Sequence, residues 1–181
     1  KLHRKKCIST LVVLMQALAQ NFKQTLNQAG SIAVGIQCFD LKKENGKTVL
    51  DANGNPVNIP GSLKCVKAIG WYIEEYGIAQ ISINLTNINV TPVHIAFDEV
   101  CRKADARGIR VTGSELVGLI PLKAMLDAGK YFLQKQKRST GVSEKELLKI
   151  AIKSLGLDEL TPFKPGERII EYMLQDKADS I

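Results

Sequence analysis

The sequence lacks any long apolar run, which excludes a membrane-spanning helix. Its longest uninterrupted run, Leu11–Met15, is far shorter than the roughly 20 residues that cross a bilayer. Aromatic residues make up only 6% of the chain, too few for rows of rings that stack on nucleic-acid bases. With 181 residues, of which 45% are apolar and 24% charged, the chain can still bury the core of one domain, or at most two.

Closely spaced metal-binding and redox motifs are also absent. The four cysteines lie 27 to 36 residues apart, with no CxxC pair, whereas zinc and dithiol sites use such pairs. We therefore expect free thiols, no metal site and a cytoplasmic location. Only two histidines occur, and His3 lies in a basic terminus. His94 is thus the candidate for histidine chemistry.

Positive charge is concentrated near the start of the chain. The net charge is +7; residues 1–60 contain 8 Lys/Arg against 3 Asp/Glu, and residues 61–181 contain 17 against 15. Basic runs at 1–6 and 135–138 raise the hypothesis of a nucleic-acid binder. Because no aromatic residues are interleaved with these cations, we expect no nucleic-acid partner. The short apolar runs likewise predict no membrane partner.

The first part of the sequence favours a helix. Over residues 8–26, apolar residues recur at the three-to-four spacing of an amphipathic helix, and Gly30 would end it. An alternative is a secretion signal, because basic residues, an apolar run and Ala17-Leu-Ala19 follow one another. The cysteine pattern favours the helix, so we predict a helical segment over residues 1–38.

A projecting hairpin is expected at about residues 44–61. Asn53-Gly54 tolerates positive φ, and Pro56 stops further pairing. The spacing of Asp51, Asn53 and Asn55 imitates a calcium-binding loop. Pro56 stands where that loop needs glycine, so we predict no calcium site.

The remainder predicts an α+β fold. Residues 64–75, 78–85 and 109–112 have strand patterns, and 169–174 is a fourth candidate strand. Helices are expected after Thr91-Pro92, from Pro121, and from Ser143 to Gly156. We predict a two-layer sandwich in which a small mixed sheet has helices packed on one face.

Several polar residues are candidate ligand contacts. In the second strand, Gln80, Ser82 and Asn84 alternate with apolar residues and form a polar row. Asn84 and Asn87 are therefore candidates, although a solvated sheet face explains them equally well. His94 lies in the first turn of a helix, where the positive helix end favours neutral imidazole; a structural His94 is the alternative. Residues 113–118 suggest a phosphate loop but lack its lysine. We therefore predict a strand-to-helix turn that presents Gly113, Ser114 and Glu115 to a small ligand.

Six ordered segments carry a resemblance to a known family: Lys67–Trp71, Ser82–Asn87, Val90–His94, Gly113–Lys123, Leu155–Asp158 and Glu167–Tyr172. Together they resemble the C-terminal subdomain of the formiminotransferase (glutamate formimidoyltransferase) family, including the form fused to formiminotetrahydrofolate cyclodeaminase. On this resemblance, residues 39–181 are the subdomain, with the hairpin as an insertion.

The resemblance implies a one-carbon transferase of histidine degradation. Such enzymes move a formimino group from N-formimino-L-glutamate to tetrahydrofolate in a groove between two subdomains. Trp71, Asn84, His94 and Ser114 would border this groove, and Lys67 and Lys123 would meet carboxylates. The family's catalytic histidine belongs to the N-terminal subdomain, so no residue here inherits its role.

Two expectations about activity follow. The chain alone should show little turnover, because the base and half of the folate surface are missing. Alternatively, it is a non-catalytic folate-binding or interaction module that needs a partner subdomain. A homodimer is a further alternative.

Overall fold

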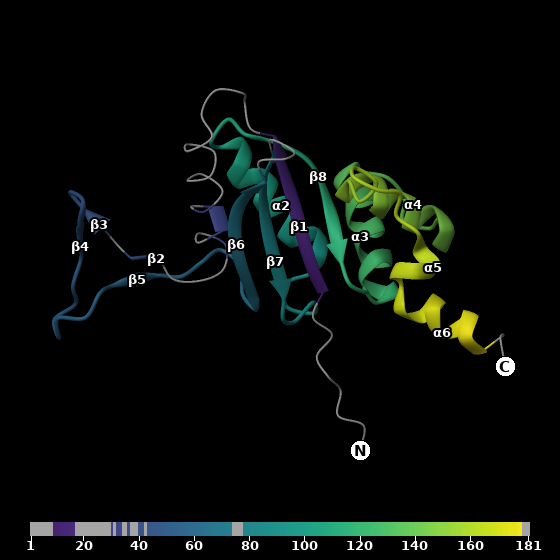
Figure 1. Ribbon diagram of the computed structural model, residues 1–181, viewed down its shortest axis with the longest axis horizontal. Coiled ribbons are helices and arrows are strands. Elements are labelled where there is room, and N and C mark those ends of the chain that lie inside the picture. The colour runs from purple at the N-terminus through teal and green to yellow at the C-terminus, as the bar shows by residue number, and fades with distance from the viewer. Residues whose placement is uncertain are drawn as a thin grey trace, which may run out of the picture.

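The computed structural model describes residues 9–16, 30, 32–33, 36, 40–41, 43–73 and 78–178. Its centre is an antiparallel sheet with the strand order β6-β7-β1-β8 (Figure 1). The strands are β1 (Ser9–Gln16), β6 (Val66–Ile73), β7 (Ile78–Leu85) and β8 (Arg110–Val117). The predicted α+β class is confirmed, and the sheet is antiparallel where a mixed one was expected.

The helix predicted over residues 8–26 is wrong where the structure describes it, because residues 9–16 form β1 at the centre of the sheet. β1 pairs with β7 from Ser9 to Gln16 and with β8 on its other side. Leu11 and Val12 are both buried, although consecutive strand residues face opposite sides. A strand buried on both faces has a continuous apolar run that also suits a helix. The rest of that predicted helix, residues 17–26, lies outside the described part of the chain.

One face of the sheet forms the main core with helix α2 (Val93–Asp105). On β7, every second residue from Ala79 to Leu85 is fully buried, and the apolar stripe of α2 joins the same cluster. The helix begins after Pro92. Thr91, which was expected to cap it, instead donates from Oγ1 to the Lys64 carbonyl at 2.6 Å.

Four further helices complete the described fold: α3 (Leu122–Lys135), α4 (Glu144–Leu155), α5 (Pro165–Arg168) and α6 (Ile170–Ala178). The start of α4 agrees with its sequence signature, because the Ser143 hydroxyl accepts from the Glu146 amide at 3.3 Å. The strand predicted at 169–174 is wrong. Only Ile169 makes a bridge, parallel to Ile120, and α6 follows it.

A slender arm projects from the body of the molecule (Figure 1). It consists of two short antiparallel pairs, β2 (Asp40–Leu41) with β5 (Asn58–Ile59) and β3 (Lys43–Glu44) with β4 (Lys47–Thr48). At its tip, the Asp51 carboxylate accepts from the Asn53 and Asn55 amides at 2.8 and 2.9 Å. Asp51, Asn53 and Asn55, whose spacing imitates a calcium-binding loop, are thus joined to one another by hydrogen bonds. No described helix is long and apolar enough to cross a membrane.

Candidate functional site

The sheet has a second face, opposite α2, that carries a mixed set of side chains. Strand alternation directs every second side chain away from the core. The burial pattern of β6 and the register with β7, β1 and β8 identify these residues. We call this surface the open face. Its described members are Val12, Lys67, Ile69, Trp71, Gln80, Ser82, Asn84, Glu115 and Val117, of which Val12 and Gln80 are buried.

Trp71 is the largest side chain on the open face. It lies opposite Gln80 in the register, and its indole Nε1 donates to Gln80 Oε1 at 3.1 Å. This bond fixes the ring while leaving 37% of the residue exposed, whereas Gln80 is 6% exposed. A held, half-exposed ring offers a flat apolar surface to a planar ligand.

Two further rows cross the sheet beside Trp71. Lys67 lies opposite Asn84, and both are exposed. Ile69 lies opposite Ser82, and the same row continues through β1 to Glu115 on β8. With strands 4.7–4.9 Å apart, a row over four strands spans about 15 Å. The open face thus carries a cation, amides, a hydroxyl and a carboxylate on the same side of the sheet as one aromatic ring.

His94 lies on the other side of the sheet. It is a member of α2, is 7% exposed, and stacks on Tyr131 of α3 with ring centroids 4.5 Å apart. Burial lowers the pKa of His94, while the Asp127 and Asp98 carboxylates act in the opposite direction. Its buried Nδ1 has no hydrogen-bond partner among the residues that the structure describes. The neutral imidazole expected from the sequence agrees with this environment, but the side chain belongs to helix packing.

Gly113 and Ser114 lie within β8, so the strand-to-helix turn predicted there is wrong. The Ser114 hydroxyl donates to the Leu155 carbonyl at 2.6 Å, and its amide donates to the Gly156 carbonyl at 2.9 Å. A Cβ on Gly113 would lie 2.8 Å from that same Gly156 oxygen. These residues join the edge of the sheet to the end of α4.

Asn87 and Lys123 also have local partners. The Asn87 side chain accepts from the Asn89 amide at 3.1 Å, and its carbonyl accepts from the Val90 and Thr91 amides. It therefore stabilises the turn between β7 and α2. Lys123 forms an ion pair with Asp127, one turn further along α3.

The expected groove bordered by Trp71, Asn84, His94 and Ser114 is not formed. Trp71 and Asn84 lie on the open face, whereas His94 and Ser114 lie on the helix side. Of the sequence-derived candidates, the structure brings together Lys67, Trp71, Asn84 and Glu115. It adds Gln80 and Ser82, which the alternation of β7 had already placed in a polar row. Their position beside Trp71 depends on a pairing register that the sequence does not specify.

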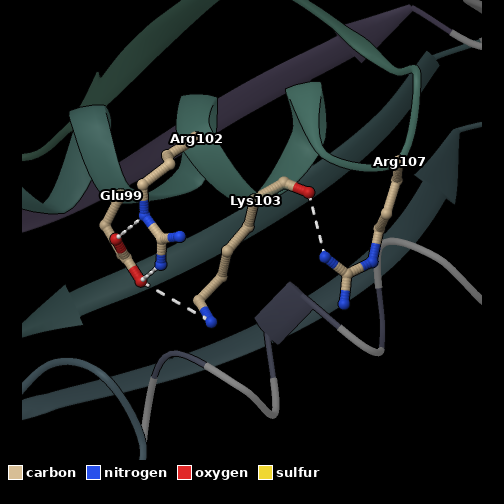
Figure 2. A network of polar contacts seen from close by, with 4 residues as sticks. All are labelled: Glu99, Arg102, Lys103 and Arg107. Carbon is tan, nitrogen blue, oxygen red and sulfur yellow. Dashed lines mark hydrogen bonds and ion pairs between the residues drawn. The ribbon is translucent and has the colours of Figure 1, made fainter.

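A separate network of charges lies along α2 (Figure 2). Glu99 accepts from Arg102 Nε and Nη2 at 2.9 and 2.8 Å, and Lys103 Nζ lies 3.5 Å away. The Arg102 guanidinium lowers the pKa of Glu99 to about 2. Arg107 donates to the Lys103 carbonyl at 2.9 Å. These bonds are internal to α2 and its C-terminal turn, so the network stabilises this segment.

A cavity of about 910 Å³ adjoins the same helix and reaches Cys101 and Tyr131. Burial raises the pKa of Cys101 to about 11, which makes the thiol a poor nucleophile near neutral pH. A hydrogen bond to Asp98 raises the pKa of Tyr131 to about 12. In the described ranges, no three His, Cys, Asp or Glu residues are grouped so as to hold a metal ion. We therefore take the open face, and not the cavity beside α2, as the candidate site for a ligand.

Comparison with known proteins points to one family. The pattern that defines the formiminotransferase domain matches residues 17–175. The chain is 49% identical over 122 residues to formimidoyltransferase-cyclodeaminase of Gallus gallus, covering 67% of this chain and 22% of that protein. The Mus musculus protein of the same name is 42% identical over 149 residues, covering 81% and 27%.

A shorter match is the glutamate formimidoyltransferase of Thermoplasma acidophilum, 39% identical over 74 residues, which are 41% of this chain and 24% of that protein. The chain thus spans about a quarter of the length of these relatives. The matched region includes all of residues 17–38, which were predicted to lie outside the subdomain.

Proposed function

The chain belongs to the formiminotransferase family, and from this membership we propose that its open face is one wall of the folate site of a glutamate formimidoyltransferase. The reaction is transfer of a formimino group from N-formimino-L-glutamate to tetrahydrofolate, in cytoplasmic histidine degradation. The subdomain boundary near residue 38 is still a prediction. β1, which precedes that boundary, pairs with β7 and β8 of the proposed subdomain.

The observation that carries this proposal is the held ring of Trp71 amid polar side chains. A pterin is flat, with hydrogen-bond donors and acceptors on its edges, and its glutamate tail bears carboxylates. Trp71 supplies a stacking surface, Asn84 supplies an amide, and Lys67 supplies a cation for a carboxylate. Glu115 is an acceptor for amino groups on the ligand.

The same surface carries no histidine among its described residues. Formimino transfer requires removal of a proton from the attacking nitrogen, and a base with a pKa near 7 does this best. His94 lies across the sheet, stacked on Tyr131. We therefore assign binding to this chain and proton transfer to a partner subdomain, so that the chain alone orients folate without turning it over.

Trp71 is the single tryptophan of the chain, so its fluorescence reports directly on the proposed site. We expect tetrahydrofolate to quench this fluorescence in a saturable titration. Lys67→Gln and Asn84→Ala should each weaken binding about tenfold, which corresponds to about 1.4 kcal/mol. Lys123→Gln is the matched control, because its ion pair lies on α3, and should leave the titration unchanged.

The titration is repeated with a separately produced N-terminal subdomain of a family member. Quenching that appears only in this mixture would favour the alternative function, a folate-binding module that needs its partner. Saturation that is identical in the Lys67, Asn84 and Lys123 variants would contradict the proposed wall.

A further inference from the structure

A second recess lies away from the open face, between α4 and the segment that follows it. Its volume is about 390 Å³, within the size range of small-ligand pockets. The apolar part of its lining comes from Leu148 and Ile152 on α4 and from Phe163 and Pro165 on the following segment. We call this recess the α4 groove.

A row of lysines borders the α4 groove. Lys145, Lys149 and Lys153 all contribute to its lining and follow one another at four-residue spacing on α4. Successive members are therefore about 6 Å apart along the helix axis. The side chains of Lys149 and Lys153 are 69% and 70% exposed. The apolar recess thus has a regularly spaced, accessible row of positive charges along one side.

Local acids compensate this row only in part. Lys149 lies 3.9 Å from Glu146, and Lys153 lies 3.0 Å from Asp158. Lys145 makes no ion pair within the described part of the chain. Three lysines therefore face two carboxylates, and the excess positive charge favours an acidic partner.

The groove is held open by bonds on its far side. The Asp158 carboxylate accepts from the Phe163 amide at 2.9 Å while it binds Lys153. The Gly156 C-cap, at φ +62°, turns the chain away from α4 into this segment. A preformed recess costs little ordering free energy when a partner binds.

We propose that the α4 groove binds an acidic amphipathic helix of a partner protein. Apolar side chains of that helix fill the recess beside Ile152 and Phe163, and its carboxylates, four residues apart, pair with the lysine row. A helix laid in a groove is a common mode of peptide recognition. A phosphate backbone or an anionic lipid surface would satisfy the lysines but leave the apolar recess unused, so the acidic helix fits both features.

The probe is a synthetic peptide about 20 residues long, with glutamate at every fourth position, leucine immediately after each glutamate and alanine elsewhere. Its length and its helix-forming residues favour a helix. We expect saturable binding to the full chain by fluorescence anisotropy of the labelled peptide. Replacing its glutamates with glutamine, or its leucines with serine, should each weaken binding at least tenfold. Binding should also weaken as salt is raised.

The protein variants are chosen to keep the fold intact. Lys145→Glu combined with Lys149→Glu reverses two exposed charges and should weaken peptide binding about tenfold or more. Lys130→Glu, an exposed lysine on α3, is the matched control and should bind as the unmodified chain does. Circular dichroism of all three proteins verifies equal folding.

Two results would overturn the proposal. One is equal peptide affinity for the Lys145/Lys149 variant and the Lys130 control. The other is binding of anionic vesicles or an oligonucleotide through Lys145 and Lys149 while the peptide does not bind. Neither result bears on the Trp71 titration, so failure here leaves the proposed folate wall to its own test.

Discussion

Gly129 shows how one missing side chain sets the distance between two helices. A Cβ at this position of α3 would lie 2.3 Å from the Leu147 carbonyl oxygen and 3.0 Å from its Cα. These are backbone atoms of α4, which can yield only if the whole helix moves. The close approach of α3 and α4 therefore depends on glycine.

Gly129→Ala is expected to lower the free energy of unfolding by about 1–3 kcal/mol through overpacking. The loss should appear even though alanine favours helix by about 1 kcal/mol over glycine. Urea denaturation measures it, with Gly141→Ala as the control because a Cβ there meets only Ser139 Oγ, at 3.6 Å. Equal midpoints for the two variants would show that α4 adjusts freely.

His94 gives the stability of the fold a pH dependence. Burial lowers the pKa of the folded-state imidazole below its ordinary value, about 6.5. As the pH falls below about 6.5, the His94 imidazole becomes protonated in the unfolded chain but stays neutral in the folded chain. The unfolded state then binds more protons than the folded state. The free energy of unfolding therefore decreases as the pH is lowered.

We expect this decrease between pH 7 and pH 5, with a slope of at most about 1.4 kcal/mol per pH unit from this residue. His94→Phe keeps a ring against Tyr131 and should flatten the decrease, leaving only the carboxylate contribution. His3→Gln, which removes the other histidine, is the control. Its free energy of unfolding should still decrease between pH 7 and pH 5. Equal slopes in the two variants, from urea denaturation at each pH, would argue against a buried neutral His94.

Among the elements, β1 has the largest effect on the architecture. Leu11 is fully buried and lies opposite Ile83 of β7 and Leu116 of β8. Leu11→Ala should lower the free energy of unfolding by about 2–5 kcal/mol, because it leaves a cavity between both neighbours. Val117→Ala, at a half-exposed position on β8, should cost far less. Urea denaturation compares them, and a small loss for Leu11 would contradict a central β1.

The sequence predicts some elements well and misassigns others for identifiable reasons. β7 was correct because Ile81 and Ile83 alternate with polar residues, a pattern that only a half-buried strand produces. β1 was misassigned because Leu11 and Val12 are both buried, so its run has no strand alternation. Neighbours more than 60 residues away decide its conformation, and local spacing carries no information about them.

The same limit applies to the candidate site. The pairing register places Trp71 and Asn84 on one face of the sheet, and their role as ligand contacts stays a prediction. His94 was a candidate because it lies in the first turn of a helix, and Ser114 because a turn was expected after its strand. The resemblance then grouped both with Trp71 and Asn84. Which side of the sheet a residue occupies depends on the packing of α2 and α4, and this is a tertiary property.

At the scale of the whole molecule, the proposed function divides binding and chemistry between this chain and a partner subdomain. If the open face is one wall of a folate site, the purified chain with tetrahydrofolate and formiminoglutamate should show turnover at least several hundredfold below that of a complete enzyme, because it lacks the proton acceptor. Product absorbance measures this. Adding an N-terminal subdomain should raise the rate, and Trp71→Ala should reduce the rate of the mixture. Rapid turnover by the chain alone would refute the division.

The central position of β1 also bears on synthesis in the cell. β1 precedes both of its sheet neighbours, so during translation it leaves the ribosome well before β7 and about a hundred residues before β8. Until residue 117 emerges, its apolar side chains have no completed sheet to enter. A nascent chain stalled before β8 should therefore recruit holding chaperones, and one stalled well beyond β8 should release them.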